Sequence, residues 1–261
     1  MPLSRKEVKN VSVLKTRKGR REQRRFAAEG VRLLEESLRF RSPPETVYHA
    51  PSLLSDRGHT LIGRLGRYAR IVQVSSRELA QLSGTMSPQG VVAVFGLPKT
   101  GLSELYRRTC RRLLVCENIS DPGNMGTLIR SARAFGFTFV SLCGCCVEPY
   151  SPKVVRASAG AVFGCRVAIA STVELLQLTD LENIMVIAAD GNSRNTKLPG
   201  ASTVRQKKVA LAIGSEAKGL SEALRAGAYA TVRVAHHSAV ESLNAAVAGS
   251  ILMKQIYDMN D

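Results

Sequence analysis

The sequence predicts an α/β protein of two domains, because strand-like and helix-like segments alternate along the chain in two separate series. The 261 residues are 44% hydrophobic, which is enough for one large domain or two small ones. The first series ends near residue 97 and the second starts near residue 112. We therefore expect a small α/β domain at 1–97, a linker at 98–108 and a larger α/β domain at 109–261.

The elements of the first domain are predicted from local residue patterns. Residues 10–25 form a basic run with no apolar face of its own, and we expect this run to be exposed and to face phosphate groups. Val31, Leu34 and Leu38 recur at helical spacing, which predicts a helix after the run. The remaining expected elements are a helical stretch at 52–65, a helix opened by the capping box Ser75–Glu78, and strands at 46–50, 69–74 and 91–95.

The second domain is expected to contain a parallel sheet with helices on both faces, because strand-like and helical runs alternate regularly. The strand-like runs are 113–116, 139–143, 166–170, 184–189, 209–213 and 231–235. Ser171 and Glu174 form another capping box, and a long terminal helix is expected from about Val240. Ligands bind beyond the carboxyl ends of such strands. This rule directs attention to three loops, 117–127, 214–220 and 235–242.

The charge of the chain favours a polyanionic partner. Lys and Arg number 37 against 21 Asp and Glu, for a formal net charge of +16. Residues 1–112 hold 23 of the basic and only 9 of the acidic side chains, so most of the excess lies in the first domain. Basic groups that contact phosphates release condensed counterions, which favours binding to a nucleic acid. The alternatives are a charge that serves only solubility and a patch for a membrane surface.

Other features of the composition point to a cytoplasmic protein that does not span a membrane. No apolar stretch approaches the roughly 20 residues that a transmembrane helix needs, and the first residues lack the apolar core of a signal peptide. Several of the six cysteines lie in apolar runs, which favours buried reduced thiols over disulfides. Three cysteines at 143, 145 and 146 have no second Cys pair or His set to complete a zinc site, so we expect no metal.

The first of the three loops leads into a helix that carries a basic side chain. Its Asp-Pro-Gly-Asn sequence at 121–124 is typical of a turn. Leu128, Ala132 and Phe135 form the buried stripe of the helix that follows, and Gly136 is placed to end it. Arg130 projects from this helix near the strand ends. A guanidinium there can hold a phosphate by two hydrogen bonds, and an ion pair with a carboxylate is the alternative.

The other two loops combine glycines and small polar side chains. Gly214 and Gly219 flank Glu216 directly after a buried strand, and glycine lets a ligand approach the backbone closely. The spacing is not that of a P-loop, the chain has no G-x-G-x-x-G, and an ordinary strand-to-helix turn is the alternative. Ser242 and Asn244 stand before a helix rich in small residues, where they can cap the helix, contact a ligand, or do both.

Taken together, the three loops resemble, in order and spacing, the three motifs of the SpoU/TrmH family of RNA ribose 2′-O-methyltransferases. The matching pieces are the Asn-x-Gly…Arg helix at 124–130, the Gly-Ser-Glu-x-x-Gly-Leu loop at 214–220, and Glu-Ser-Leu-Asn at 241–244. Residues 25–34 look like part of the L30-like (L30e-like) substrate-binding domain of this family. The resemblance therefore covers nearly the whole chain.

The resemblance implies a fold, a cofactor and partners that periodicity does not reveal. It implies that the second domain has the SPOUT fold, in which the chain threads into a deep trefoil knot that holds the methyl donor S-adenosyl-L-methionine. General topology rules treat knots as nearly absent, so the alternation alone predicts a plain doubly wound sheet. The resemblance further implies a homodimer and an RNA substrate. The separate basic domain favours 23S-type ribosomal RNA.

By position, the resemblance also assigns roles to individual residues. Arg130 is implied to be the catalytic arginine, with Asn124, Glu216, Ser242 and Asn244 arranging the site. The implied cofactor-binding residues are Ala188, Gly214, Val234, His236 and Leu243. Arg156 looks like a further basic contact for cofactor or RNA. From the basic run itself we expect RNA phosphates to be bound by Arg17, Lys18, Arg20, Arg21, Arg24 and Arg25.

The implied reaction needs a group that removes a proton. A ribose 2′-hydroxyl is a poor nucleophile and must lose its proton as it attacks the sulfonium methyl. Arginine is an unusual base because its pKa exceeds about 12. Two accounts of Arg130 stay open: RNA phosphate and polar neighbours prepare it to accept the proton, or it only positions that phosphate. Positioning with electrostatic stabilisation is the part that the residue type supports.

One departure from the family pattern keeps other functions open. Where the family usually has Ile-Pro-Met and a later glycine, this chain has Val234-Ala235-His236 and then Ser238, which changes one wall of the cofactor pocket. The alternatives are a transfer RNA substrate, a non-catalytic RNA-binding protein on the same fold, and an enzyme that methylates a base. A role in resistance to ribosome-targeting antibiotics stays open beside a housekeeping role.

Overall fold

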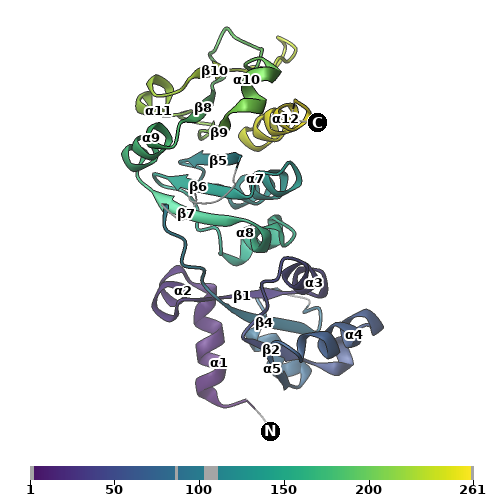
Figure 1. The fold of residues 1–261 in the computed structure, drawn as a ribbon. Coiled ribbons are helices and arrows are strands. Elements are labelled where there is room, and N and C mark those ends of the chain that lie inside the picture. The colour runs from purple at the N-terminus through teal and green to yellow at the C-terminus, as the bar shows by residue number, and fades with distance from the viewer. Residues whose placement is uncertain (1–2, 86–87, 103–110, 260–261) are drawn as a thin grey trace. The chain divides into compact units, whose positions relative to one another are not determined.

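The computed structural model describes residues 3–85, 88–102 and 111–259, and it divides the chain into two compact units (Figure 1). The first unit consists of Met1–Lys99 together with Glu148–Gly164, and the second of Thr100–Val147 together with Cys165–Asp261. The first unit therefore includes a segment, Glu148–Gly164, that the sequence placed in the second domain. Most of the expected linker at 98–108 lies outside the described residues.

The first unit is built on a four-stranded mixed sheet with the order β1-β4-β2-β3. Its strands are β1 (Arg25–Glu29), β2 (Thr46–His49), β3 (Arg70–Gln73) and β4 (Val91–Gly96). Its α-helices are α1 (Arg5–Ser12), α2 (Arg17–Gln23), α3 (Val31–Arg39), α4 (Asp56–Leu65), α5 (Ser76–Leu82) and α8 (Pro152–Ala157), and short 3₁₀ turns cover Val13–Lys15, Pro51–Leu53 and Ala161–Gly164. The helices and strands predicted between residues 31 and 95 are all present.

The basic run before β1 differs from the prediction. It is not a bare exposed segment, because α1, the turn after it and α2 bring Val11 and Leu14 into the core, where their side chains are buried. The capping boxes explain how two of the short helices start: Ser4 with Glu7 opens α1, and Ser75 with Glu78 opens α5 as predicted. The run therefore contributes to the core of the first unit as well as to its charge.

Residues 148–164 complete the core of the first unit. Phe26 of β1 stacks on Phe95 of β4 with ring centroids 5.2 Å apart, and Tyr150 lies 4.9 Å from Phe26. Phe163 lies 4.8 Å from Phe95. Aromatic pairs at these distances add stability beyond the burial of their area. Two strands of the first unit thus depend on aromatic partners that come later in the chain.

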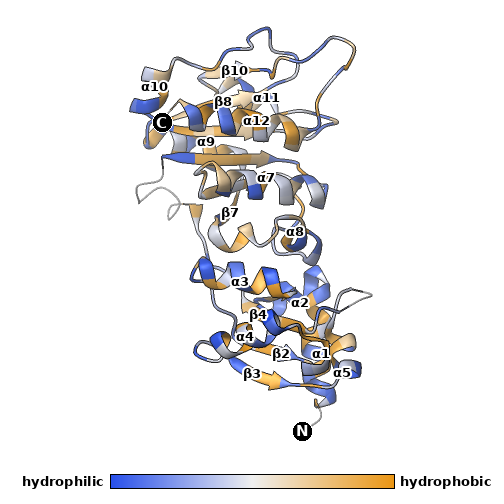
Figure 2. Cartoon of the chain, turned by 90° about the vertical axis from the view of Figure 1, so that its right-hand side faces the viewer, coloured by the Kyte–Doolittle hydropathy of each residue, from blue (hydrophilic) through white to orange (hydrophobic). Residues whose placement is uncertain are grey.

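The second unit contains a six-stranded parallel sheet with the order β10-β8-β9-β5-β6-β7. Its strands are β5 (Arg112–Glu117), β6 (Phe139–Cys143), β7 (Arg166–Ala170), β8 (Ile184–Ala189), β9 (Lys208–Ile213) and β10 (Ala230–Val232), which confirms all six predicted strands. Figure 2 shows hydrophobic residues concentrated along the strands. The central strands are buried nearly throughout, as expected for a parallel sheet covered on both faces.

Helices cover both faces of this sheet, as predicted. They are α7 (Pro122–Ala134), α9 (Thr172–Leu181), α10 (Ala201–Gln206), α11 (Glu222–Ala226) and α12 (Ala245–Asp258). In Figure 1, α9 and α11 lie on one face, and α7 and α12 on the other. A methyl group on Gly249 of α12 would come within 2.7 Å of Leu128 on α7, which explains why α12 is rich in small residues. The knotted path of the chain stays a prediction.

The terminal helix starts later than predicted. It begins at Ala245, not near Val240, because Asn244 caps it by accepting hydrogen bonds from the amides of Ala246 and Val247. Residues 235–243 therefore form an irregular loop. This difference matters for the site, because a loop can place its backbone groups against a ligand whereas a helix uses them internally.

The described cysteines are free thiols, as predicted. Burial raises the pKa of Cys143 to about 11 and that of Cys165 to about 12, so both stay protonated at neutral pH. Among the described residues no group of His, Cys, Asp and Glu side chains is arranged to hold a metal ion. Within the same residues, no helix has the length and apolar character required to cross a membrane.

Candidate active site

The three predicted loops meet at the carboxyl edge of the parallel sheet. Asn124 of α7 donates its side-chain amide to Oε1 of Glu216 at 3.1 Å. Asn244 donates its amide to the same carboxylate oxygen at 2.5 Å and to Oδ1 of Asn124 at 2.9 Å. These residues come from positions up to 120 apart in the chain. A closed triangle of hydrogen bonds, the polar triangle, thus joins one side chain from each motif.

The first motif places Asn124 and Arg130 on the same helix. Asp121 caps α7 by accepting from the amide of Asn124 at 2.8 Å, and Pro122 occupies the first turn, where its missing N–H costs nothing. Arg130 is exposed on α7 and makes no hydrogen bond or ion pair with any residue that the structure describes. The alternative that Arg130 serves an ion pair with a carboxylate therefore finds no support in the described part of the chain.

The second motif is a tight loop after β9. Gly219 donates its amide to the carbonyl of Ser215 at 2.8 Å, which closes the loop into a small bridge. Gly219 itself has a φ of +63°, a conformation that glycine adopts without strain. A Cβ on Gly214 would lie only 2.2 Å from the backbone of Gly219. The side chain of Glu216 is presented at the tip of this loop, where it joins the polar triangle.

Gly214 provides a direct test of this loop. We expect Gly214→Ala to weaken S-adenosylmethionine binding about 10- to 100-fold, because the added methyl group must displace backbone and overpacking of this kind costs about 1–3 kcal/mol. Isothermal titration calorimetry measures the affinity. Gly63→Ala is the matched control, since a methyl group there meets no atom within 4 Å. Unchanged cofactor affinity in Gly214→Ala would show that the loop does not contact the cofactor.

The third motif serves capping and the polar triangle at once. The oxygen of Asn244 caps α12 while its nitrogen reaches Glu216 and Asn124, so the two alternatives left open by the sequence coexist. Ser242 is exposed and forms no hydrogen bond with the described residues, and Leu243 is half-buried beside it. His236 turns its Nδ1 to the carbonyl of Val234 at 2.8 Å, which fixes the ring against its own loop.

The remaining predicted cofactor residue, Ala188, is fully buried near the end of β8. It is paired with Ala212 of β9 on one side and Thr231 of β10 on the other. Both Ala188 and Ala212 belong to the hydrophobic core of the second unit. The structure thus brings the three motifs of the second unit to one edge of one sheet, whereas Arg156, which the sequence placed in the same domain, lies in the first unit.

Sequence reasoning missed two residues at the end of β5. Glu117 is buried and accepts hydrogen bonds from the amide and hydroxyl of Ser221, at 2.6 and 2.8 Å, and from the hydroxyl of Thr172 at 2.9 Å. Asn118 adopts a left-handed φ of 58° and accepts from the amide of Cys145 at 2.8 Å. A carboxylate at the end of an otherwise apolar strand was the signal available in the sequence. Glu117 fixes the segment that follows the second motif.

The predicted RNA contacts of the basic run divide into buried and exposed residues. Arg20 is only 3% exposed, and its guanidinium binds the Glu148 carboxylate and the Leu14 carbonyl, with Nε 3.1 Å from Oε1 of Glu148. The prediction that Arg20 contacts RNA is therefore wrong, because its donors are used inside the protein. Arg25 is paired with Glu45, and Lys18 lies 3.9 Å from Glu22, both at the surface. The exposed members that form no such pair with a described residue are Arg17, Arg21 and Arg24.

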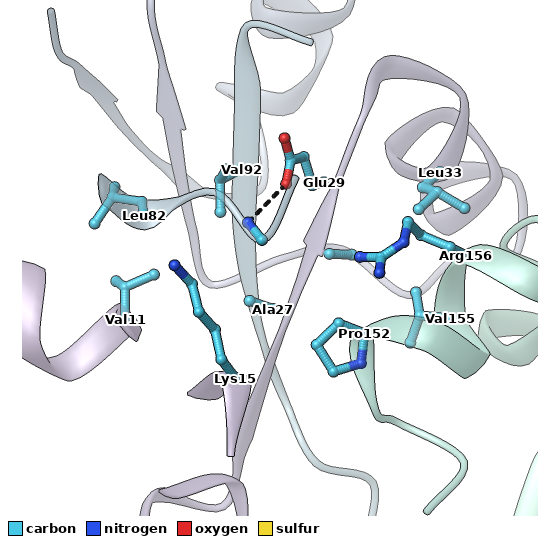
Figure 3. A pocket seen from close by; sticks show the side chains of 12 residues that line it. Val11, Lys15, Ala27, Glu29, Leu33, Leu82, Val92, Pro152, Val155 and Arg156 are labelled. Carbon is cyan, nitrogen blue, oxygen red and sulfur yellow. Dashed lines mark hydrogen bonds between the residues drawn. The ribbon is translucent and has the colours of Figure 1, made fainter. Parts of the chain in front are cut away.

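Arg156 lies in the first unit, on α8. It lines a pocket between α8 and the sheet, and in Figure 3 its guanidinium extends into this pocket from one side while Lys15 enters from another. Glu29 at the far wall accepts hydrogen bonds from the amide of Gly84 at 3.1 Å and from the hydroxyl of Ser83 at 2.7 Å. The carboxylate of Glu29 thereby holds the segment after α5 against β1.

Comparisons with known proteins agree with this arrangement. Residues 111–254 match the SpoU rRNA Methylase family, and residues 5–93 match the MRM3-like substrate binding domain. The chain is 30% identical over 250 residues, 94% of its own length and 88% of the other's, to an uncharacterized tRNA/rRNA methyltransferase of Synechocystis. It is 27% identical to the 23S rRNA (guanosine(2553)-2′-O)-methyltransferase RlmP of Bacillus subtilis, covering 95% and 94% of the two chains.

Longer relatives and a solved structure extend the comparison. The chain spans only 37% of the human mitochondrial rRNA methyltransferase 3, with 30% identity over 157 residues. The crystal structure of an AdoMet-bound rRNA methyltransferase from Sinorhizobium meliloti superposes with a TM-score of 0.83 and 26% identity, over 99% of this chain and 96% of the other. The match over more than half of the sequence, on the residues that form the site, shows that the chain belongs to the SpoU rRNA methylase family.

Proposed function

We propose that this protein transfers a methyl group from S-adenosyl-L-methionine to a ribose 2′-hydroxyl of RNA, and that 23S-type ribosomal RNA is the substrate. The polar triangle of Asn124, Glu216 and Asn244 carries the proposal, because it joins all three motifs at the edge of the sheet where ligands bind. The similarity to the 23S rRNA 2′-O-methyltransferase of Bacillus subtilis and to the rRNA methyltransferase of Sinorhizobium meliloti supports the reaction and the RNA class.

The residues present fit the methyl donor. Gly214 leaves the second loop without a side chain where its backbone turns, and the half-buried Val234 and Leu243 offer apolar surface on the third loop. Adenosine needs an apolar slot with backbone polar groups at its edges, which these loops supply. Ala235, His236 and Ser238 differ from the usual family pattern, but they do not remove the apolar surface of Val234 and Leu243. The reason is that the His236 ring is turned to the backbone of its own loop. The bound cofactor would supply the electrophilic methyl group.

We assign the polar triangle a positioning role. The carboxylate of Glu216 accepts two amide N–H groups on one oxygen, which ties the cofactor loop to the starts of α7 and α12. Ser242 is exposed at the same edge, and its hydroxyl is available to a ligand. Such a framework holds reacting groups in place without further reorganisation during the reaction.

Arg130 then acts on the RNA. Its guanidinium is exposed, belongs to the same helix α7 as Asn124, and has no partner in the described part of the chain, so it can bind a phosphate next to the reacting ribose by two hydrogen bonds. This places the 2′-hydroxyl at the methyl group and stabilises the charge that develops as the hydroxyl loses its proton. On the first unit, the exposed Arg17, Arg21 and Arg24 are the members of the basic run that can reach RNA phosphates.

A trefoil-knotted homodimer in the cytoplasm belongs to the same proposal. It is supported by the family resemblance of the second unit. Size-exclusion chromatography with light scattering tests the dimer. A mass of about 28 kDa in solution, that of a single chain, would contradict it.

Transfer of labelled methyl groups tests the reaction and the RNA class together. The purified protein is incubated with labelled S-adenosylmethionine and with ribosomal RNA or transfer RNA, and the RNA is then digested to nucleosides. We expect label in one 2′-O-methyl nucleoside from ribosomal RNA. Label from transfer RNA alone would favour the alternative substrate, and label on a base would contradict ribose chemistry. If the protein binds the cofactor but transfers no methyl group to free RNA or to ribosomal particles, the proposed enzymatic activity is wrong and a non-catalytic RNA-binding protein is favoured.

A further inference from the structure

The first unit has a groove where α3 and α4 end. Six residues line it, here called the arginine groove: Leu38, Arg41, Pro43, Arg64, Arg67 and Tyr68. Its volume is about 440 Å³, within the range of about 300–1,000 Å³ that is usual for sites that hold small ligands. None of these residues belongs to the motifs or to the basic run, so the site described above does not account for it.

The three arginines of the groove are exposed and unpaired. None of them forms a hydrogen bond or an ion pair through its side chain with a residue in the described ranges, and no carboxylate lines the groove. The nearby acidic side chains have other cations as partners. Those pairs are Glu35 with Arg57, Glu36 with Arg39 and Glu45 with Arg25. The charge of Arg64 also acts on Glu35 and helps to lower the pKa of that carboxyl, after the larger effect of the hydrogen bond from Arg57.

The arginines are not needed to cap the helices that they follow. The last carbonyls of α3 accept backbone amides, with Ser42 donating to Ser37 at 2.8 Å. At the end of α4, Gly66 donates to Ile62 at 3.0 Å and Tyr68 donates to Leu65 at 2.9 Å. Backbone groups thus satisfy these helix ends, and the guanidiniums keep their donors for a ligand.

Tyr68 adds an aromatic surface to this positive groove. Its side chain is 62% exposed, which is high for a large aromatic residue, and it lies with Leu38 and Pro43 among the groove residues. An exposed ring beside guanidiniums is the arrangement that binds single-stranded nucleic acid, where a base stacks on the ring and phosphates meet the cations. A duplex keeps its bases stacked on one another and cannot use such a ring.

We propose that the arginine groove binds an unpaired stretch of the substrate RNA, with Arg41, Arg64 and Arg67 on phosphates and Tyr68 stacked on a base. This proposal rests on the proposed function in that it takes RNA as the substrate. It adds a contact that helps select which RNA is held, because the groove favours a single-stranded segment of the substrate over a continuous helix.

Binding of short RNAs to the full chain tests the groove. The probes are a fluorescein-labelled 12-nucleotide single-stranded RNA of mixed sequence and the duplex formed with its complement. Fluorescence anisotropy measures the affinity of the protein for each probe at several NaCl concentrations. We expect the triple variant Arg41→Ala, Arg64→Ala, Arg67→Ala to bind the single strand at least about tenfold more weakly. The slope of log K against log salt should fall by about 2, because each phosphate contact on a single strand contributes about 0.7.

The ring and the position of the charges have separate controls. Tyr68→Ala should weaken single-strand binding about 5- to 100-fold, whereas Tyr68→Phe keeps the ring and should bind as the unaltered protein does. The matched charge control replaces Arg5, Lys6 and Arg77 with alanine, since these exposed residues lie on α1 and α5 and not in the groove. Equal losses in the charge control, or an unchanged affinity in Tyr68→Ala, would overturn the proposal. The proposal would also be overturned if all groove variants lost as much affinity for the duplex as for the single strand.

Methyl transfer distinguishes failure of the groove from failure of the proposed function. The groove variants should raise KM for RNA and leave kcat unchanged, since no groove residue belongs to the polar triangle. If the unaltered protein binds the single strand through the groove but transfers no methyl group, the proposed function fails and the groove stands. If methyl transfer occurs and the groove variants keep the KM and the RNA affinity of the unaltered protein, the groove fails alone.

Discussion

Replacement of Arg130 by alanine is expected to lower kcat for methyl transfer at least about a hundredfold and to leave the Kd for S-adenosylmethionine within a few-fold. The reason is that Arg130 is exposed and unpaired within the described residues, so its donors are available to RNA and hold no protein group in place. Removal of one preorganised donor to developing charge typically costs about a hundred- to a thousandfold in rate. Single-turnover methyl transfer and calorimetry of cofactor binding measure the two effects.

The same variant series tests the role that Arg130 plays. Arg225→Ala is the matched control, because Arg225 pairs with the exposed Glu222 on the short helix α11 and with no other carboxylate of the described residues. In Arg130→Lys, a base mechanism predicts a pH–rate profile shifted toward the lysine pKa of about 10.4, whereas phosphate positioning predicts a lower rate with an unshifted profile. Loss of cofactor binding in Arg130→Ala would contradict an action on the RNA.

Replacement of Arg20 by alanine is expected to destabilise the first unit by about 3–5 kcal/mol, because it leaves the Glu148 carboxylate without its partner in a largely buried site. The side chains of Arg20 and Glu148 are only 4% and 15% exposed, so solvent does little to replace the lost interaction. Urea unfolding followed by circular dichroism measures the loss. Arg21→Ala is the matched control on the same helix, and its exposed side chain should change stability by no more than about 0.5 kcal/mol.

A second substitution separates charge from packing at this pair. Replacing Arg20 with Met and Glu148 with Leu removes both charges and keeps apolar volume, and we expect this double variant to recover most of the lost stability. If Arg20→Ala unfolds at the same urea concentration as the unaltered protein and binds RNA less tightly, Arg20 contacts RNA and the structural role is wrong.

Much of the fold could be predicted from the sequence, because its signals are local. The six strands of the parallel sheet are continuous apolar runs, and the capping boxes at Ser75 and Ser171 mark helix starts without reference to the rest of the chain. The three motif loops were also predictable, since the carboxyl ends of parallel strands meet at one edge. The predicted start of α12 was too early because residues 240–243 carry no pattern that separates a loop from a helix, and the helix begins only after Asn244 supplies the cap.

What the sequence could not supply depends on contacts between distant residues. Arg20 looks like any other member of a basic run, and only the approach of Glu148, 128 positions later, buries it. The same holds for β1, whose Phe26 is buried against Tyr150 and Phe95 although Arg25 beside it is exposed. The arginine groove is likewise assembled from two helix ends. Periodicity reports which face of an element is apolar, but it does not report which partner covers that face.

The placement of residues 148–164 in the first unit has a consequence for how the chain folds as it is synthesised. The strands of the first unit are complete by Gly96, yet the aromatic partners Tyr150 and Phe163 emerge from the ribosome only after β5 and β6 of the second unit. At about 5–20 residues per second, the nascent first unit waits roughly 3–13 s with Phe26 and Phe95 uncovered. Because exposed apolar surface favours aggregation, we expect the core of the first unit to be completed only after Phe163 has been synthesised.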